Sequence, residues 1–265
     1  MRRISLHTSL SFSRFFCLLF GLGLVAATAS RAETVIEQAT VLVSEGNLID
    51  AETLLMPLVG KRPDAAALNL MSQVRTGQMR SAEAVEFAER AVKADSGHPA
   101  YFCQLGRALT HRYGEVGPYE QDQIAGKIRK VYEKAVALDP KCLPALIGLC
   151  QFYYTMAPVV GGDLEKAGNL ATRIRQLDPV DGETELASLA QAKQDFAGAV
   201  AHYEAANKLK PGDAALHIHW ARCLLTLGRR AEARAQLEEA LKIDPKLGEI
   251  RKMLDGLDKM EPPKP

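Results

Sequence analysis

Leu216–Gly228 reads LHIHWARCLLTLG, and Arg230–Leu241 reads RAEARAQLEEAL shortly before Pro245. Small and apolar residues recur at helical spacing in both segments. The glycine between them suits the left-handed turn that ends a helix, and the proline stops the second helix because it has no N–H to donate. This stretch therefore predicts a helical hairpin with one apolar face.

The end of this hairpin recurs along the chain. ALKIDP at 240–245 is matched by ANKLKP at 206–211, IRQLDP at 174–179 and AVALDP at 135–140, and the last three prolines are 32 and 34 residues apart. A single hairpin cannot bury its apolar face, so repeated hairpins stack to share one continuous core.

The small and apolar positions of these units resemble the tetratricopeptide repeat (TPR) family, most closely in the last two units. The resemblance implies an all-α fold, an α-solenoid of about six TPR-like helical hairpins with a C-terminal capping helix. We expect a leader at 1–32, hairpins at about 32–64, 65–98, 99–141, 142–179, 180–213 and 214–247, a cap at 248–258 and a charged, proline-rich tail at 259–265, so that the array covers 33–258.

Two units depart from the regular length. The third is about eight residues too long, and we expect the excess near Tyr113–Gln123, between its helices. The fourth carries an insert at Ala157–Asp163 before a second helix at about Leu164–Leu177, with Asp163 as the N-cap. The left-handed position of the turn between helices is expected at Gly46, Gly77 and Gly228 in their units.

The first 32 residues have the layout of a secretory signal peptide. Three arginines precede the apolar run Phe15–Ala27, and Ala27-Thr28-Ala29 offers small residues for cleavage. An uncleaved membrane anchor is the alternative, but the run is shorter than the roughly 20 residues that span a bilayer. Arg2-Arg3 also permits twin-arginine export, although Ser5 stands where an apolar residue is expected. We predict a Sec-type signal peptide, a periplasmic or secreted location and no stable membrane insertion after cleavage.

The charge balance excludes one class of partner. The whole chain of 265 residues has 33 basic and 32 acidic side chains. Removal of the leader takes away four arginines, which leaves 29 basic against 32 acidic side chains and a net charge of −3. A mildly acidic protein does not attract phosphate backbones, so we expect no nucleic-acid partner.

No motif for catalysis, metal binding or a cofactor is present in the sequence. His217 and His219 are two residues apart, which places them on different sides of a helix. Gly161-Gly162-Asp163 lacks the lysine of a phosphate loop and fits a turn before an N-cap. We therefore expect no enzyme activity, no metal and no cofactor.

The TPR resemblance implies a concave surface, formed by the first helix of each hairpin, that holds a peptide or a partner helix. The chain is then a non-catalytic periplasmic protein–protein interaction scaffold. The family's lining positions fall on Asn69, Gln73, Arg107, His111, Gln151, Tyr154, Ser188, Gln191 and Arg222. Arg107 and His111 share one helical face, and we expect Tyr154 to reach the same trough unless it packs under the insert.

An alternative function comes from the insert. Pro158–Ala167, PVVGGDLEKA, resembles a segment of the periplasmic helical T-component of TRAP-type transport systems, which implies a solute-binding accessory protein. A closed pocket or pore favours that function, and an open groove favours the scaffold.

The helix order also places Cys103 near Cys142. The two cysteines either form a disulfide or remain small buried apolar side chains. The sequence leaves open the partner, the pathway and the oligomeric state.

Overall fold

The computed structural model describes residues 33–60 and 63–260. Within these ranges the secondary structure is helical and no strand occurs, so the all-α prediction is confirmed. The chain divides into two compact units, one ending at Ser96 and the other beginning at Gly97. The predicted leader 1–32 and the last five residues of the predicted tail lie outside the described residues.

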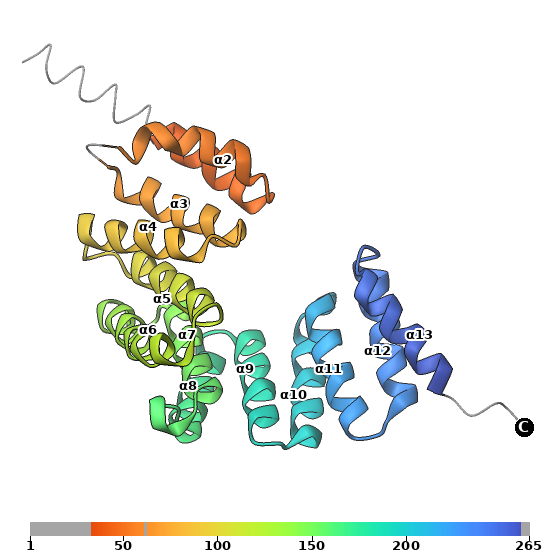
Figure 1. Cartoon of the computed structure of the whole chain (residues 1–265). Coiled ribbons are helices and arrows are strands. Elements are labelled where there is room, and N and C mark those ends of the chain that lie inside the picture. The colour runs from red at the N-terminus through yellow and green to blue at the C-terminus, as the bar shows by residue number, and fades with distance from the viewer. Residues whose placement is uncertain (1–32, 61–62, 261–265) are drawn as a thin grey trace, which may run out of the picture. The chain divides into compact units, whose positions relative to one another are not determined.

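The N-terminal unit is a short stack of helices (Figure 1). It contains a helix over residues 33–44, α2 (Leu48–Leu55), the 3₁₀ turn η1 (Met56–Leu58), α3 (Ala65–Gly77) and α4 (Ser81–Ala94). In α4, Ala84, Ala88 and Ala91 are fully buried at i, i+4 and i+7. Alanine at these positions lets the backbone of α4 come close to α3, against which it packs.

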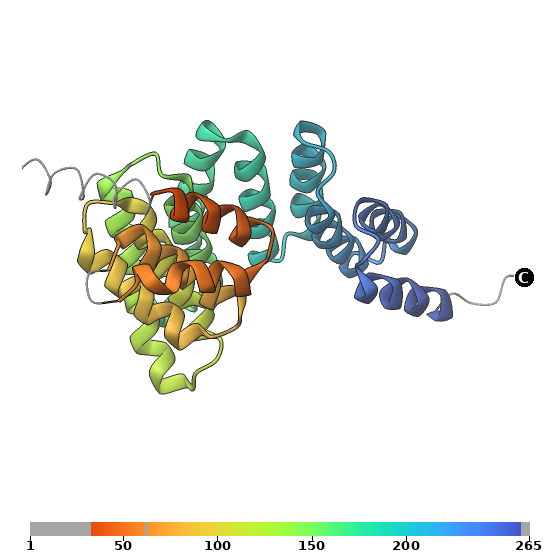
Figure 2. The same cartoon turned by 90° about the horizontal axis from the view of Figure 1, so that it is seen from above.

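The C-terminal unit continues the same pattern. Its elements are α5 (Pro99–Tyr113), α6 (Pro118–Leu138), α7 (Leu143–Thr155), η2 (Pro158–Val160), α8 (Leu164–Leu177), α9 (Pro179–Ala192), α10 (Phe196–Leu209), α11 (Ala214–Thr226), α12 (Arg230–Ile243) and α13 (Gly248–Met260). Each helix packs against the next one in sequence, and both views follow this succession from α5 to α13 (Figures 1 and 2). The predicted solenoid is therefore confirmed, with α13 covering the end of the array.

Buried small residues and helix-capping residues determine how the helices pack and where they end. In α10 and α12 the buried stripes are Ala199, Tyr203 and Ala206, and Ala233, Leu237 and Ala240, at the repeat positions read from the sequence. Asp178 ends α8 and begins α9: its carboxylate accepts hydrogen bonds from two backbone N–H groups, of Val180 and Asp181. Pro179 follows at the first helical position, where no intrahelical N–H bond is lost.

The fourth unit matches its prediction and the third differs. Helix α8 has the predicted bounds Leu164–Leu177, and the Asp163 carboxylate caps it by accepting from the N–H groups of Glu165 and Lys166. In the third unit the extra residues lie mainly within α6, which is 21 residues long, so their predicted position between the helices is wrong. Pro118 at the first turn starts the helix early, and the following residues favour helix.

The turns between paired helices share one geometry. Gly46 and Gly228 have positive φ, as predicted, at 77° and 73°. Gly77 was predicted to do the same, but it is the last residue of α3, and Met79 takes the left-handed position at φ 60°. The Met79 N–H donates to the Thr76 carbonyl as the Gly228 N–H does to Leu225, so the turn is set by its hydrogen bonds and not by where the glycine lies.

Replacing Met79 with glycine is expected to raise the free energy of unfolding by about 0.5–1 kcal/mol. A side chain in the left-handed region costs about 1–2 kcal/mol, part of which is offset by the chain entropy of glycine. Met79 is 73% exposed, so little packing is lost. Lys193→Gly is the matched control, because Lys193 is exposed in the turn after α9, has an ordinary φ of −82° and should lose stability. Urea unfolding compares them, and a less stable Met79→Gly protein would contradict this account.

No helix in the described part of the chain combines the length and apolar character needed to cross a membrane.

Candidate functional site

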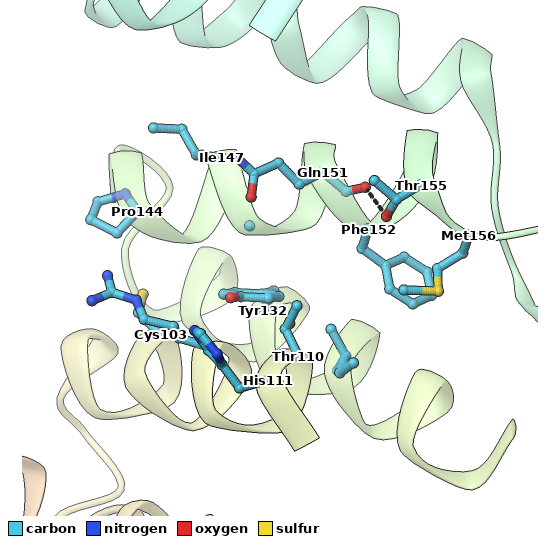
Figure 3. Close-up of a pocket in the computed structure, with 13 residues that line it drawn as sticks. Cys103, Thr110, His111, Tyr132, Pro144, Ile147, Gln151, Phe152, Thr155 and Met156 are labelled. Atoms are coloured by element: carbon cyan, nitrogen blue, oxygen red, sulfur yellow. Dashed lines mark hydrogen bonds between the residues drawn. The ribbon is translucent and has the colours of Figure 1, made fainter. Parts of the chain in front are cut away.

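A pocket of about 510 Å³ lies in the C-terminal unit between α5 and α7, with α6 beneath it (Figure 3). We call it the α5–α7 pocket. Its lining residues are Cys103, Arg107, Thr110, His111, Ile128, Tyr132, Pro144, Ile147, Gly148, Gln151, Phe152, Thr155 and Met156. The first helices of the third and fourth hairpins thus form its two walls.

The floor is the ring of Tyr132, which lies between the two walls in Figure 3. A Cβ atom added at Gly106 of α5 would come within 2.5 Å of this ring, and one added at Gly148 of α7 within 2.3 Å. No real side chain tolerates such distances, so the two glycines make the space that the ring fills. Burial raises the pKa of the Tyr132 hydroxyl to about 12.

The mouth of the pocket is polar and open. Arg107, Thr110 and His111 on α5 are exposed, as are Gln151 and Thr155 on α7. Arg107 and His111 are the basic side chains of the lining, and no carboxylate lines the pocket among the residues that the structure describes. The arrangement therefore presents positive charge above an apolar floor.

Gln151 connects this pocket to a buried polar cluster on the other side of α7. Its amide Nε2 donates to Glu185 Oε1 of α9 over 3.0 Å. Glu185 is 5% exposed, and burial raises the pKa of its carboxyl group, against the lowering effect of the Gln151 bond. Glu185 is buried because α7 packs directly against α9.

Tyr154 does not join Arg107 and His111 in the α5–α7 pocket. It is half-buried and lines a second, smaller cavity with Pro158, Gly162 and Asp163 of the insert. Burial, and next the charge of Glu185, raise the pKa of the Tyr154 hydroxyl. The expectation that Tyr154 reaches the same trough is therefore corrected, and its packing beside the insert is the arrangement observed.

The remaining residues of the predicted surface lie elsewhere. Ser188 and Gln191 are half-buried on α9; the Ser188 hydroxyl donates to the Thr184 carbonyl, and the Gln191 amide donates to the Tyr203 hydroxyl. Arg222 is exposed on α11. The structure thus brings Arg107, His111 and Gln151 together in one pocket and holds Ser188 and Gln191 in internal hydrogen bonds.

Asn69 and Gln73 belong to the N-terminal unit. Both are half-buried on α3 and four residues apart, so they share a face of that helix. The Asn69 Oδ1 atom is buried without a hydrogen-bond partner among the described residues. These two residues form a separate candidate surface.

Sequence reasoning missed most of the apolar lining, including Ile128, Phe152 and Met156. The usable signal was Gly106 and Gly148 at corresponding places of neighbouring first helices, with a tyrosine between them in the sequence. The two glycines lack side chains where α5 and α7 face each other, so the Tyr132 ring can lie between these helices as the floor of a pocket.

The chemistry of the site suits binding. The described residues contain no group of three or more His, Cys, Asp or Glu side chains placed to hold a metal ion. The α5–α7 pocket combines an apolar floor with amide, hydroxyl and basic groups at its mouth, and a lining of this kind is typical of binding pockets.

Comparison with solved structures agrees with this architecture. A TPR protein of Thermus thermophilus has a TM-score of 0.64 and 19% identity, over 73% of this chain and 98% of that one. PilW, a type IV pilus biogenesis factor, has a TM-score of 0.62 and 13% identity, over 84% and 97%. PilF of Pseudomonas aeruginosa has a TM-score of 0.56 and 16% identity, over 84% and 96%. At these identities the likeness concerns the fold.

The sequence comparison is more local. No curated protein matches the chain. Residues 190–254, which contain α10 to α12, match the family model described as tetratricopeptide repeat. This match covers the hairpin α11–α12 and the second helix of the hairpin before it, and the helical hairpins continue upstream through α3. Residues 190–254 therefore carry tetratricopeptide repeats, and the rest of the array resembles solved TPR proteins in its fold.

Proposed function

We propose that this protein is a non-catalytic periplasmic scaffold that holds a protein partner at the α5–α7 pocket. TPR proteins are generally non-catalytic scaffolds, and the fold implies a protein partner. The observation that carries the finer proposal is a pocket with an aromatic floor, two basic residues at its mouth and no carboxylate among its described lining residues. An apolar side chain of the partner fills the pocket, and an acidic group beside it meets Arg107 and His111.

The openness of the pocket supports a peptide or helix more than an enclosed solute. Five polar lining residues are exposed at the mouth, so a chain can pass over it while one side chain enters. Arginine at such a site is a frequent contributor to binding energy because it combines charge with a flat apolar surface. The resemblance of Pro158–Ala167 to a TRAP T-component stays a prediction, as does export by a Sec-type signal peptide.

Changing Arg107 and His111 together to alanine is expected to weaken partner capture about tenfold or more. Loss of an anchor residue costs about 1–3 kcal/mol, and both side chains are exposed, so the fold should remain intact. The chain carries a photo-crosslinker at Thr155, on the opposite wall of the pocket, and is exposed to the periplasmic fraction. Mass spectrometry then identifies the crosslinked segment of the partner. An affinity measurement with that segment as a peptide gives the effect of each variant.

Arg230→Ala is the matched control, because Arg230 is an exposed arginine on α12 outside the pocket. It should bind like the wild type. Arg107→Glu should bind worse than Arg107→Ala, and added salt should weaken wild-type binding, if the partner's group is acidic. Unchanged affinity in the double variant, with helicity unchanged by circular dichroism, would exclude this pocket.

A further inference from the structure

Two cysteine thiols meet at one edge of the α5–α7 pocket. Cys103 is buried on α5, and Cys142 is half-buried at the N-cap of α7. Their Sγ atoms lie 3.7 Å apart although 39 positions separate the residues in the sequence. Both are free thiols in this structure.

We propose that Cys103 and Cys142 are a redox-modification site, at which oxidation forms an intramolecular disulfide that ties α5 to the start of α7. These two helices form the walls of the α5–α7 pocket. In the oxidised protein the disulfide therefore fixes the distance between α5 and α7 at one end of the pocket. The proposal rests on the thiol geometry and is independent of partner binding.

The structure needs only a local adjustment to form this bond. A disulfide has sulfur atoms about 2.05 Å apart, so the two Sγ atoms must approach by about 1.6 Å. Cys142 precedes the first turn of α7 and has a non-helical backbone, with φ −64° and ψ 95°, so rotation of its side chain does not disturb a packed helix. The bond would close a loop that contains all of α6, which lies between the two cysteines.

The other two cysteines of the described chain are placed differently. Cys150 is fully buried, and its thiol donates to the Ala167 carbonyl over 3.4 Å. Cys223 is buried on α11 in the core shared by α9 to α13. Neither is in contact with another cysteine among the described residues, so they serve as internal references for thiol accessibility.

The reaction is a thiol–disulfide exchange with an external disulfide, such as oxidised glutathione or a protein disulfide. Cys142 is the more exposed sulfur; its thiolate attacks one sulfur of the donor and releases the first donor thiol. Cys103 then gives its proton to solvent, attacks Cys142 Sγ and releases the second donor thiol. Two cysteine thiols are oxidised while one donor disulfide becomes two thiols, so electrons and atoms balance.

The environment of Cys103 sets the rate of the second step. Burial, followed by the neighbouring Cys142 sulfur, raises the pKa of the Cys103 thiol to about 12. Few Cys103 thiolates are present at neutral pH, so closure of the bond should become faster as the pH rises toward that value.

The test is oxidation of the purified full-length protein in glutathione buffers of rising oxidised fraction, followed by alkylation and intact-mass measurement. Before alkylation the oxidised protein should be about 2 Da lighter than the reduced protein, as two hydrogens leave, and after alkylation it should carry two fewer alkyl groups. Trypsin places Cys103 in the peptide 94–107 and Cys142 in 142–166, which also contains Cys150. Fragmentation of the crosslinked pair, repeated in Cys150→Ala, assigns the bond to Cys142. Cys103→Ser and Cys142→Ser should abolish it, whereas Cys223→Ser should leave it intact.

The structural consequence gives a second readout. A loop of this length should raise the thermal midpoint of the oxidised protein by about 5–10 °C over the reduced one. Amide hydrogen exchange near 99–106 and 143–149 should slow at the same time. Free Cys103 and Cys142 thiols in fully oxidised glutathione buffer at pH 8, or a bond formed instead with Cys150 or Cys223, would overturn the proposal.

Discussion

Replacing Glu52 with leucine is expected to lower the free energy of unfolding of the N-terminal unit by about 3 kcal/mol. Arg75 is 5% exposed, and its Nη2 atom lies 2.6 Å from Glu52 Oε1, while its Nη1 donates to Gln78 Oε1. Loss of the Glu52 carboxylate leaves a buried guanidinium whose remaining acidic neighbour, Glu83, is at 3.2 Å from Nε. Breaking a buried pair costs about 3–5 kcal/mol, and the lower end applies because Glu52 is 27% exposed.

The same pair makes stability depend on pH. The Arg75 and Gln78 hydrogen bonds lower the pKa of Glu52 from 4.5 to about 2. A depressed folded-state pKa contributes stability that is fully present above about pH 4.5 and is lost as the pH falls toward 2. After allowance for solvent screening this amounts to about 2 kcal/mol. The wild type should lose most of this amount between about pH 5 and pH 2.5 and the rest below about pH 2, and Glu52→Leu should not.

Urea unfolding, with hydrogen exchange of α2 to α4 to localise the effect, measures both results. Arg80→Ala is the matched control: Arg80 pairs with Glu83 at 2.7 Å but is exposed, so its loss should cost less than about 0.5 kcal/mol. The double variant Glu52→Leu with Arg75→Met should be more stable than the sum of the single changes predicts, because it removes both charges. Additive effects would contradict a coupled pair.

Replacing Tyr132 with alanine is expected to lower the free energy of unfolding of the C-terminal unit by about 3–5 kcal/mol. The ring is buried and fills the space left by Gly106 and Gly148, so its removal opens a cavity between α5, α6 and α7. Tyr132→Phe keeps the ring and should cost less than about 1 kcal/mol. The variants are compared by thermal and urea unfolding.

A double-variant cycle tests whether the glycines and the ring form one unit. Gly148→Ala should destabilise the wild type by about 1–3 kcal/mol, because the new Cβ would lie 2.3 Å from the ring. In the Tyr132→Ala background the same change should cost much less, since the space is empty. Gly126→Ala on α6 is a control with no atom within 4 Å of the added Cβ. An equal cost of Gly148→Ala in both backgrounds would show that the contact is not the cause.

The sequence by itself determined the hairpins and their local chemistry. Helical spacing of alanine and leucine, the Asp-Pro helix ends and the glycine turns predicted α8 with its correct bounds and the cap at Asp163. These features depend on neighbours within one or two helical turns, which is why they can be read from a linear pattern. Helix order also placed Cys103 close to Cys142.

The tertiary structure decided which side chains share a space. Tyr154 and Gln151 are three residues apart on α7, yet Gln151 lines the α5–α7 pocket and Tyr154 lines the cavity beside the insert. Glu185 has the sequence surroundings of an exposed helix carboxylate, but in the structure α7 packs over it and Gln151 of α7 donates to it. Tyr132 becomes a pocket floor only because glycines on two other helices face it. Such outcomes depend on the rotation and separation of whole helices, and these are set by contacts between residues far apart in the chain.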